Sequence, residues 1–302
     1  MTLRLAILCA GQGAQHAGMF ALARTAAGMS ARIDAWALPC DADIFANRNA
    51  QPLVVGAACA IWQALQARLP QPHIIAGYSV GEVAALAVAG IIEPADAIAL
   101  ARTRASAMDA CVDPRMSQGL AAISGLPMAV LMSLLAGVNA SSPTYVAIEN
   151  GEDQAIVGGM SAALDDLRAA VEARGARMQR LPVGVASHTP LMVGAIMPLQ
   201  NALAELCLLS PRTRLLAGIS GAVVADAPAA LQSLIAQTSK TVRWRACMDA
   251  IAESGATVAL ELGPGTGLAR MLSARHPQIT CRAVDDFRSI DGIVRWMTRL
   301  AD

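Results

Sequence analysis

Short apolar runs recur along the chain and predict the strands of a buried sheet. Residues 3–9 are apolar apart from Arg4, residues 74–76 precede a glycine, and residues 258–262 lead into a glycine-rich turn. A last strand is predicted at residues 279–284, where Thr280 and Arg282 interrupt the apolar residues. Apolar runs that do not alternate with polar positions are typical of parallel strands, which helices cover on both faces.

Between these predicted strands, apolar residues recur at the spacing of an α-helix. Within residues 52–69 one stripe carries Val55, Cys59, Trp62 and Leu65, which predicts a core helix. Further helices are predicted at residues 94–108, from the segment after residue 190 to about 206, and at 231–239, 242–254, 268–274 and 293–300. Alternating strands and helices predict an α/β fold with a parallel sheet.

The pattern changes in the middle of the chain. Strands are predicted at residues 120–124, 145–149, 155–157 and 177–183, and helices at 128–136 and 162–174. Their β-α-β-β-α-β order predicts a small ferredoxin-like α+β subdomain at residues 117–185. We expect it to be inserted into a large α/β-hydrolase-like catalytic domain made of residues 1–116 and 186–302.

Composition narrows the classes of function. Of 302 residues, 55% are hydrophobic and 15% are charged, and the formal net charge is zero, so neither nucleic acid nor an anionic membrane is an expected partner. The seven cysteines lack Cys-x-x-Cys spacing and their number is odd, so we expect neither a disulfide framework nor a metal site. The first nine residues are too short for a signal peptide, and no apolar run reaches membrane-spanning length. These features predict a soluble, cytoplasmic protein.

The sequence Gly77-Tyr78-Ser79-Val80-Gly81 lies between a predicted strand and a predicted helix. This is the sequence form of a nucleophile elbow, a sharp turn that exposes the hydroxyl of the central serine. The backbone N–H of Val80 would then point at an oxyanion formed on Ser79. A glycine-serine turn without chemistry is the alternative, since Gly-x-Ser-x-Gly alone is common by chance.

Four other residues are candidates for chemistry. Gln12 lies in the glycine-flanked loop Gly11-Gln12-Gly13-Ala14-Gln15, where its amide could project into a site. His188 lies in a Ser/Thr-flanked turn before a helix and is the best candidate base for Ser79, although a lone histidine is more often structural. Arg102 and Arg104 lie on opposite sides of an apolar helix, so at least one could face inward, where it would need an anionic partner.

Four motifs stand in one order: Gly11-Gln12-Gly13-Ala14-Gln15, Gly77-Tyr78-Ser79-Val80-Gly81-Glu82, Ala186-Ser187-His188 and Glu261-Leu262-Gly263-Pro264-Gly265. Together they resemble the malonyl-CoA:acyl-carrier-protein transacylases, including the acyltransferase domains of polyketide and fatty acid synthases. Within this group the chain looks most like the transacylase (epsilon) subunit of malonate decarboxylase. Tyr78 replaces the histidine usual in fatty acid synthesis, and residues 282–292 are similar to the end of those subunits.

The resemblance implies a role for each matching position. Ser79 matches the nucleophile, His188 its base, and Gln12 the side chain that shares the oxyanion hole with Val80. Arg104 matches the arginine that pairs with the malonyl carboxylate. Gln237 matches the residue whose backbone carbonyl orients the catalytic histidine.

The resemblance also implies a reaction and its partners. Malonyl would pass from malonyl-CoA to Ser79 and then to the thiol of an acyl carrier protein, without a metal or organic cofactor. The carrier would be the malonate decarboxylase carrier subunit; the alternative is the acyl carrier protein of fatty acid or polyketide synthesis. Ala186-Ser187-His188 leaves malonyl and methylmalonyl open, and Cys9-Ala10 replaces the Phe-Pro that often precedes the Gln12 loop.

Two more distant alternatives remain. A serine hydrolase or thioesterase would share the elbow but should carry an acid between the serine and the histidine. A docking subunit without catalytic activity would bind a carrier protein but would not need Ser79, His188, Gln12 and Arg104 together.

Overall fold

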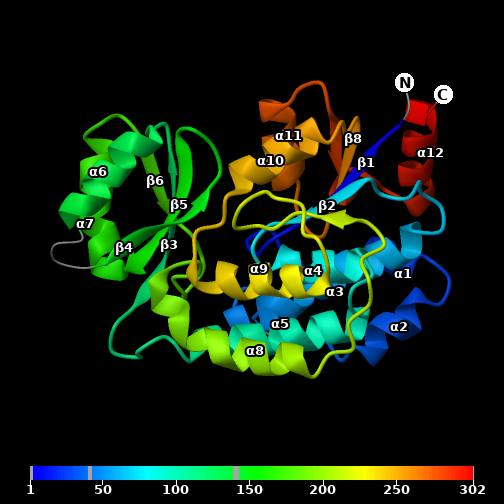
Figure 1. Ribbon diagram of the computed structural model, residues 1–302, viewed down its shortest axis with the longest axis horizontal. Coiled ribbons are helices and arrows are strands. Elements are labelled where there is room, and N and C mark those ends of the chain that lie inside the picture. The colour runs from blue at the N-terminus through cyan, green and yellow to red at the C-terminus, as the bar shows by residue number, and fades with distance from the viewer. Residues whose placement is uncertain (1–2, 40–42, 139–142, 302) are drawn as a thin grey trace.

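Five parallel strands form the larger of two sheets (Figure 1). In the computed structural model, which describes residues 3–39, 43–138 and 143–301, their order is β7-β2-β1-β8-β9. The strands are β1 (Leu5–Cys9), β2 (Ile74–Gly77), β7 (Arg214–Leu215), β8 (Val258–Leu262) and β9 (Thr280–Ala283). All five residues of β1 and of β8 are buried, as the predicted apolar runs require.

Helices cover both faces of this sheet because its central strands are apolar on both sides. Leu5, Ile7 and Cys9 of β1 belong to one hydrophobic core, and Ala6 and Leu8 to another. The first core includes residues of α3 (Asn47–Leu65), α4 (Gly81–Val88), α5 (Pro94–Asp109), α8 (Ile196–Ala204), α9 (Ala227–Ser239) and α12 (Ile290–Ala301). The second includes residues of α10 (Trp244–Glu253) and α11 (Gly267–Arg275).

The middle of the chain forms a second sheet beside the first, at the left of Figure 1. Its antiparallel strands lie in the order β4-β5-β3-β6. They are β3 (Gln118–Ser124), β4 (Thr144–Glu149), β5 (Gln154–Met160) and β6 (Arg177–Arg180), connected by α6 (Met128–Val138) and α7 (Ser161–Glu172). This sheet and its two helices have their own hydrophobic core.

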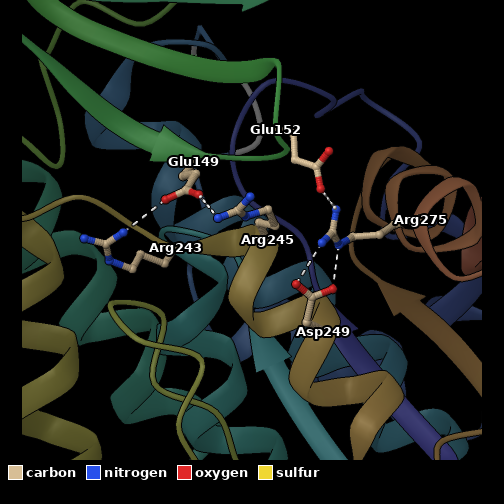
Figure 2. Close-up of polar contacts among 6 residues, drawn as sticks. All are labelled: Glu149, Glu152, Arg243, Arg245, Asp249 and Arg275. Atoms are coloured by element: carbon tan, nitrogen blue, oxygen red, sulfur yellow. Dashed lines mark hydrogen bonds and ion pairs between the residues drawn. The ribbon is translucent and has the colours of Figure 1, made fainter. Parts of the chain in front are cut away.

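Backbone hydrogen bonds and ion pairs join the two sheet regions. Val242, just before α10, donates to the carbonyl of Ala147 (2.9 Å) and accepts from the backbone N–H of Glu149 (2.8 Å). Around this contact lie the pairs of Glu149 with Arg243 and Arg245, and of Arg275 with Asp249 and Glu152 (Figure 2). The Glu149 side chain is only 11% exposed, whereas its partners Arg243 and Arg245 are 56% and 37% exposed, so these pairs lie at the solvent-facing edge of the interface.

Several element boundaries differ from the sequence predictions. Helix α3 begins at Asn47 rather than at Pro52, and β6 ends at Arg180 rather than at residue 183. The short elements α1 (Ala21–Arg24), α2 (Met29–Ala35), β7, the 3₁₀ helix η1 (Pro190–Ala195) and the 3₁₀ helix η2 (Val284–Asp286) were not predicted as such. Within the three described ranges, no helix has both the length and the apolar content required to cross a membrane.

Candidate active site

Ser79 occupies the turn between β2 and α4 with a φ of +56°, in the left-handed region that side chains rarely adopt. The glycines around it are required by space. A Cβ at Gly77 would lie 2.3 Å from the Glu82 backbone, and one at Gly81 would lie 2.1 Å from the carbonyl oxygen of Cys9. The strand, the strained serine and the helix therefore form the sharp turn that the sequence predicts.

His188 faces this serine. Its Nε2 lies 2.6 Å from Ser79 Oγ, and its Nδ1 lies 2.5 Å from the backbone carbonyl oxygen of Gln237 on α9. A carbonyl only accepts, so Nδ1 carries the proton and Nε2 is free to accept the serine proton. His188 itself has a φ of +62°, and its backbone N–H donates to Thr238.

The His188 ring is held in its neutral form. Burial, together with the positive charge of Arg104, lowers the pKa of His188 to about 3, although the Gln237 carbonyl opposes the shift. A neutral imidazole is the form that can take a proton from a hydroxyl.

Arg104 and Arg102 point in different directions from α5. Arg102 is exposed and donates to the carbonyls of Trp36 and Ala37, whereas Arg104 is only 1% exposed. Nη1 of Arg104 donates to Gln51 Oε1 (2.7 Å), and its Nε and Nη2 have no hydrogen-bond partner among the described residues. Burial lowers the pKa of Arg104 to about 10, and the Glu82 carboxylate opposes this shift. The guanidinium therefore stays charged at neutral pH and has donors to offer.

Gln12 is connected to Arg104 through two amide side chains. Gln12 Nε2 donates to Asn47 Oδ1 (3.3 Å), Gln51 Nε2 donates to the same oxygen (2.8 Å), and Gln51 Oε1 accepts from Arg104. The Gln12 amide is thus held by Asn47 at the start of α3. Val80 lies at the start of α4, where the first backbone N–H groups have no acceptor within the helix.

Glu82, Gln51 and Asn47 are functional candidates that the sequence reasoning missed. Glu82 is 1% exposed and accepts hydrogen bonds from Ser233 Oγ (2.8 Å) and Gln237 Nε2 (3.0 Å). Burial raises its pKa to about 7. A carboxylate within an otherwise apolar helix was the available signal for Glu82. The two amides carry no comparable signal, because α3 has many other polar residues near its start.

A cleft of about 700 Å³ lies between the two sheet regions and has His188 in its wall. The lining side chains come from α6 and β4 on one side, and from the segment after α9 on the other. They include Met128, Met132, Leu135, Tyr145, Val146, Lys240 and Arg243. The wall is largely apolar, and it also carries the Glu149 carboxylate, which pairs with Arg243.

A serine hydrogen-bonded to a neutral histidine, which a backbone carbonyl orients, can perform nucleophilic acyl transfer. The described residues contain no group of three or more His, Cys, Asp or Glu side chains placed to hold a metal ion.

Comparison with known proteins gives one consistent family. The acyl transferase domain family matches residues 42–289. The malonyl CoA-acyl carrier protein transacylase of Mycobacterium bovis is 31% identical over 303 residues, which cover 95% of this chain and 98% of that protein.

Solved structures indicate the same family. The acyl-carrier-protein S-malonyltransferase of Burkholderia pseudomallei superposes with a TM-score of 0.90 at 30% identity, covering 97% of this chain and 100% of that one. A malonyl-transacylase in complex with a type II polyketide synthase acyl-carrier protein gives 0.88 at 26% identity, covering 97% and 99%. The parallel sheet of a mixed α/β fold, the elbow and these likenesses together establish that the chain belongs to the acyl transferase domain family and is an acyltransferase.

Proposed function

We propose that the protein transfers a malonyl group from malonyl-CoA to the thiol of an acyl carrier protein, through a malonyl ester of Ser79. The observation that carries this proposal is Arg104, a buried cation with two unpartnered donor atoms, close enough to His188 for its charge to lower the histidine pKa. A buried unpaired guanidinium is costly unless a ligand pairs with it. A free carboxylate on the acyl group would do so.

The Ser79–His188 pair would supply the covalent chemistry. His188 Nε2 takes the hydroxyl proton, Oγ attacks the thioester carbonyl, and the protonated histidine returns the proton to the departing CoA thiolate. The carrier thiol then attacks the ester by the same steps in reverse. A thiolate leaves readily, which suits a histidine oriented by the Gln237 carbonyl instead of a carboxylate.

Gln12 and the backbone N–H of Val80 would stabilise the tetrahedral oxyanion. Gln12 Nε2 has a long hydrogen bond of 3.3 Å to Asn47, so turning it toward the substrate gives up little.

Arg104 would select the acyl group. Its planar fork can bind a carboxylate through two parallel hydrogen bonds, which lysine cannot copy. Acetyl and other neutral acyl groups would leave the buried charge unpaired and should therefore react poorly.

The carrier is most consistent with fatty acid or polyketide synthesis. The relatives named above are a malonyl CoA-acyl carrier protein transacylase and a malonyl-transacylase bound to a polyketide carrier. A malonate decarboxylase carrier is a second candidate, favoured by Tyr78 in the elbow and by residues 282–292. Tyr78 donates to Asn150 Oδ1 (3.1 Å), so the residue that sets the elbow apart contacts the second sheet region.

The finer description of the fold is also a proposal. Strand order β4-β5-β3-β6 in β-α-β-β-α-β sequence supports a ferredoxin-like subdomain at residues 117–185. A parallel sheet with the serine after one of its strands supports an α/β-hydrolase-like domain from residues 1–116 and 186–302. A cytoplasmic location stays a prediction from the sequence.

The decisive experiment is to mix the protein with malonyl-CoA or acetyl-CoA, quench the reaction and measure the intact mass, with Ser79→Ala in parallel. A malonyl adduct that is absent from Ser79→Ala, with little acetyl adduct, would support the proposal. Free CoA without an adduct would indicate a hydrolase, and neither adduct nor turnover would indicate a binding subunit. Malonyl transfer to an acyl carrier protein and to a malonate decarboxylase carrier would then be compared.

A further inference from the structure

We propose that Glu82 is a positioning residue for acyl transfer, which holds the Gln237 side chain so that Gln237 fixes both Ser79 and His188. This inference rests on the proposed acyl-serine mechanism and adds to it a buried carboxyl group that makes no contact with the nucleophile hydroxyl. Glu82 lies on α4, three residues after Ser79, and its carboxyl group turns toward α9.

Gln237 makes three contacts that bear on the site. Its backbone carbonyl accepts from His188 Nδ1. Its side-chain Nε2 donates one hydrogen to the Ser79 carbonyl oxygen (2.9 Å) and the other to Glu82 Oε2 (3.0 Å). One residue therefore holds the base through its main chain and the strained elbow through its side chain.

The orientation of the Gln237 amide depends on Glu82. Its Oε1 is buried and has no hydrogen-bond partner among the described residues, so the amide leaves an acceptor unsatisfied while both hydrogens of Nε2 are used. An unsatisfied buried acceptor is unfavourable, and the two hydrogen bonds that Nε2 donates, to the Ser79 carbonyl and to Glu82, offset this cost. Without the Glu82 oxygen only the Ser79 carbonyl would favour this orientation.

Glu82 is itself firmly held. Ser233 Oγ donates to Oε1, and the Gly218 backbone N–H donates to the carboxylate. A Cβ at Gly218 would lie 2.5 Å from Glu82 Oε2, so glycine is what lets this backbone approach the carboxylate. Ser233 and Gln237 are four residues apart on α9, so both face α4.

The required property is an acceptor facing Gln237. An ionised carboxylate, a protonated carboxyl group and a glutamine amide can each present an oxygen to Gln237 Nε2. The Ser233 hydroxyl can donate or accept and so can adapt to all three. Glu82→Gln should therefore retain function, whereas Glu82→Met, of similar length but without the acceptor, should not.

The test measures how fast Ser79 reacts with a fluorophosphonate probe and, separately, with malonyl-CoA before steady state. In the probe reaction Ser79 Oγ bonds to phosphorus, fluoride leaves and His188 takes the proton, so neither malonyl recognition nor a carrier is needed. We expect Glu82→Met to slow both reactions at least tenfold with KM for malonyl-CoA unchanged. Glu82→Gln should stay within threefold of wild type. Equal losses in the two variants, or a normal Glu82→Met, would overturn the proposal.

A double-mutant cycle separates positioning from damage to the fold. Gln237→Met removes the contact with Glu82 together with the donor to the Ser79 carbonyl but keeps its own backbone carbonyl, so it should cause a loss at least as large. Because both variants break the contact between Glu82 and Gln237, Glu82→Met combined with Gln237→Met should be no slower than the slower single variant; multiplied losses would contradict the proposal. Gln232→Met, the same substitution at an exposed position of α9, is the matched control and should react normally. If Glu82→Met does not fold, the test relies on Gln237→Met, provided that its melting temperature is unchanged. A normal reaction rate in that variant would overturn the proposal.

The probe also separates this inference from the proposed function. If wild type reacts with the fluorophosphonate but not with malonyl-CoA, the proposed donor is wrong, and the probe rates of the variants still decide the role of Glu82.

Discussion

Arg104 and Gln51 are joined by a hydrogen bond of 2.7 Å inside the protein, so one side of the guanidinium is fixed, while its Nε and Nη2 find no partner in the part of the chain that the structure describes. Under the proposed function, those donors bind the acyl carboxylate. We expect Arg104→Ala to lose malonyl transfer and to gain relative activity on acetyl-CoA and propionyl-CoA, measured as kcat/KM for each donor. Arg102→Ala, two positions away and at the surface, is the control; unchanged selectivity in Arg104→Ala would refute the assignment.

Gln51 should affect the same selectivity for the acyl group, because it holds Arg104 in position. Gln51→Met removes the acceptor for Nη1, and losing a hydrogen bond to a charged group costs about 1.5–3 kcal/mol. The guanidinium would then be free to turn, so we expect KM for malonyl-CoA to rise roughly tenfold or more. Reaction with the fluorophosphonate probe should not change. A parallel fall in probe reactivity would show that Gln51 supports the nucleophile rather than the acyl pocket.

Gln12 is predicted to donate to the oxyanion. Removing one such donor costs roughly 3 kcal/mol, so Gln12→Ala should slow acylation of Ser79 on the order of a hundredfold. Gln12→Glu, which has the same size but no N–H donor, should be equally slow. Stopped-flow release of CoA measures both variants, and a rate near wild type in either would remove Gln12 from the oxyanion hole.

The low pKa of His188, about 3, predicts how acylation depends on pH. A base that is already neutral gains nothing as the pH rises from 5 to 8, so the acylation rate should show no titration near 6.5, the ordinary histidine value. The measurement is repeated in Glu82→Gln, because the Glu82 pKa of about 7 falls in the same range. A step near 6.5 that persists in Glu82→Gln would show that His188 is protonated more easily than its burial implies.

Glu82 should make the stability of the fold depend on pH. Burial raises its pKa from 4.5 to about 7 in the folded state, so between these values the folded chain binds the proton more tightly than the unfolded chain. The stabilisation is complete below about 4.5 and is lost as the pH rises through 7. Its charged or titratable neighbours are Arg104 on α5, with a pKa of about 10, and Cys247 on α10, whose pKa burial raises. Glu82→Gln cannot ionise, so its melting temperature relative to wild type should be higher at pH 8 than at pH 5. An equal difference at both pH values would contradict this expectation.

The central strands were the most predictable part of the fold. β8 was predicted to the residue and β1 within two residues, because buried parallel strands leave continuous apolar runs. Pro52 misled the prediction for α3: it lies inside the helix rather than at its start. In β6, Leu181 still donates to Leu120, but Pro182 has no N–H to continue the pairing. α1 and α2 have only 4 and 7 residues, too few for a periodic pattern to stand out.

The predictability of the site differs from residue to residue. Ser79 and its turn were predictable because the spacing of the two glycines around the serine indicates a particular local backbone conformation. The 2.6 Å contact with His188 joins residues 109 apart in the chain; the Ser/Thr-flanked turn made His188 the best candidate base, and the resemblance implied the same pairing. The hydrogen bonds of Gln51, Asn47 and Glu82 reach across helices, and a residue's neighbours in sequence do not report its partners in space.

The left-handed backbone of Ser79 limits which amino acids the chain can tolerate there. A glycine would adopt this φ without steric strain, yet it would remove the hydroxyl of the proposed nucleophile. Relief of backbone strain therefore favours glycine at position 79 and the proposed acyl transfer requires serine, so selection for stability alone would remove the proposed activity. Engineers who seek a thermostable variant should exclude this position from any search ranked by melting temperature alone.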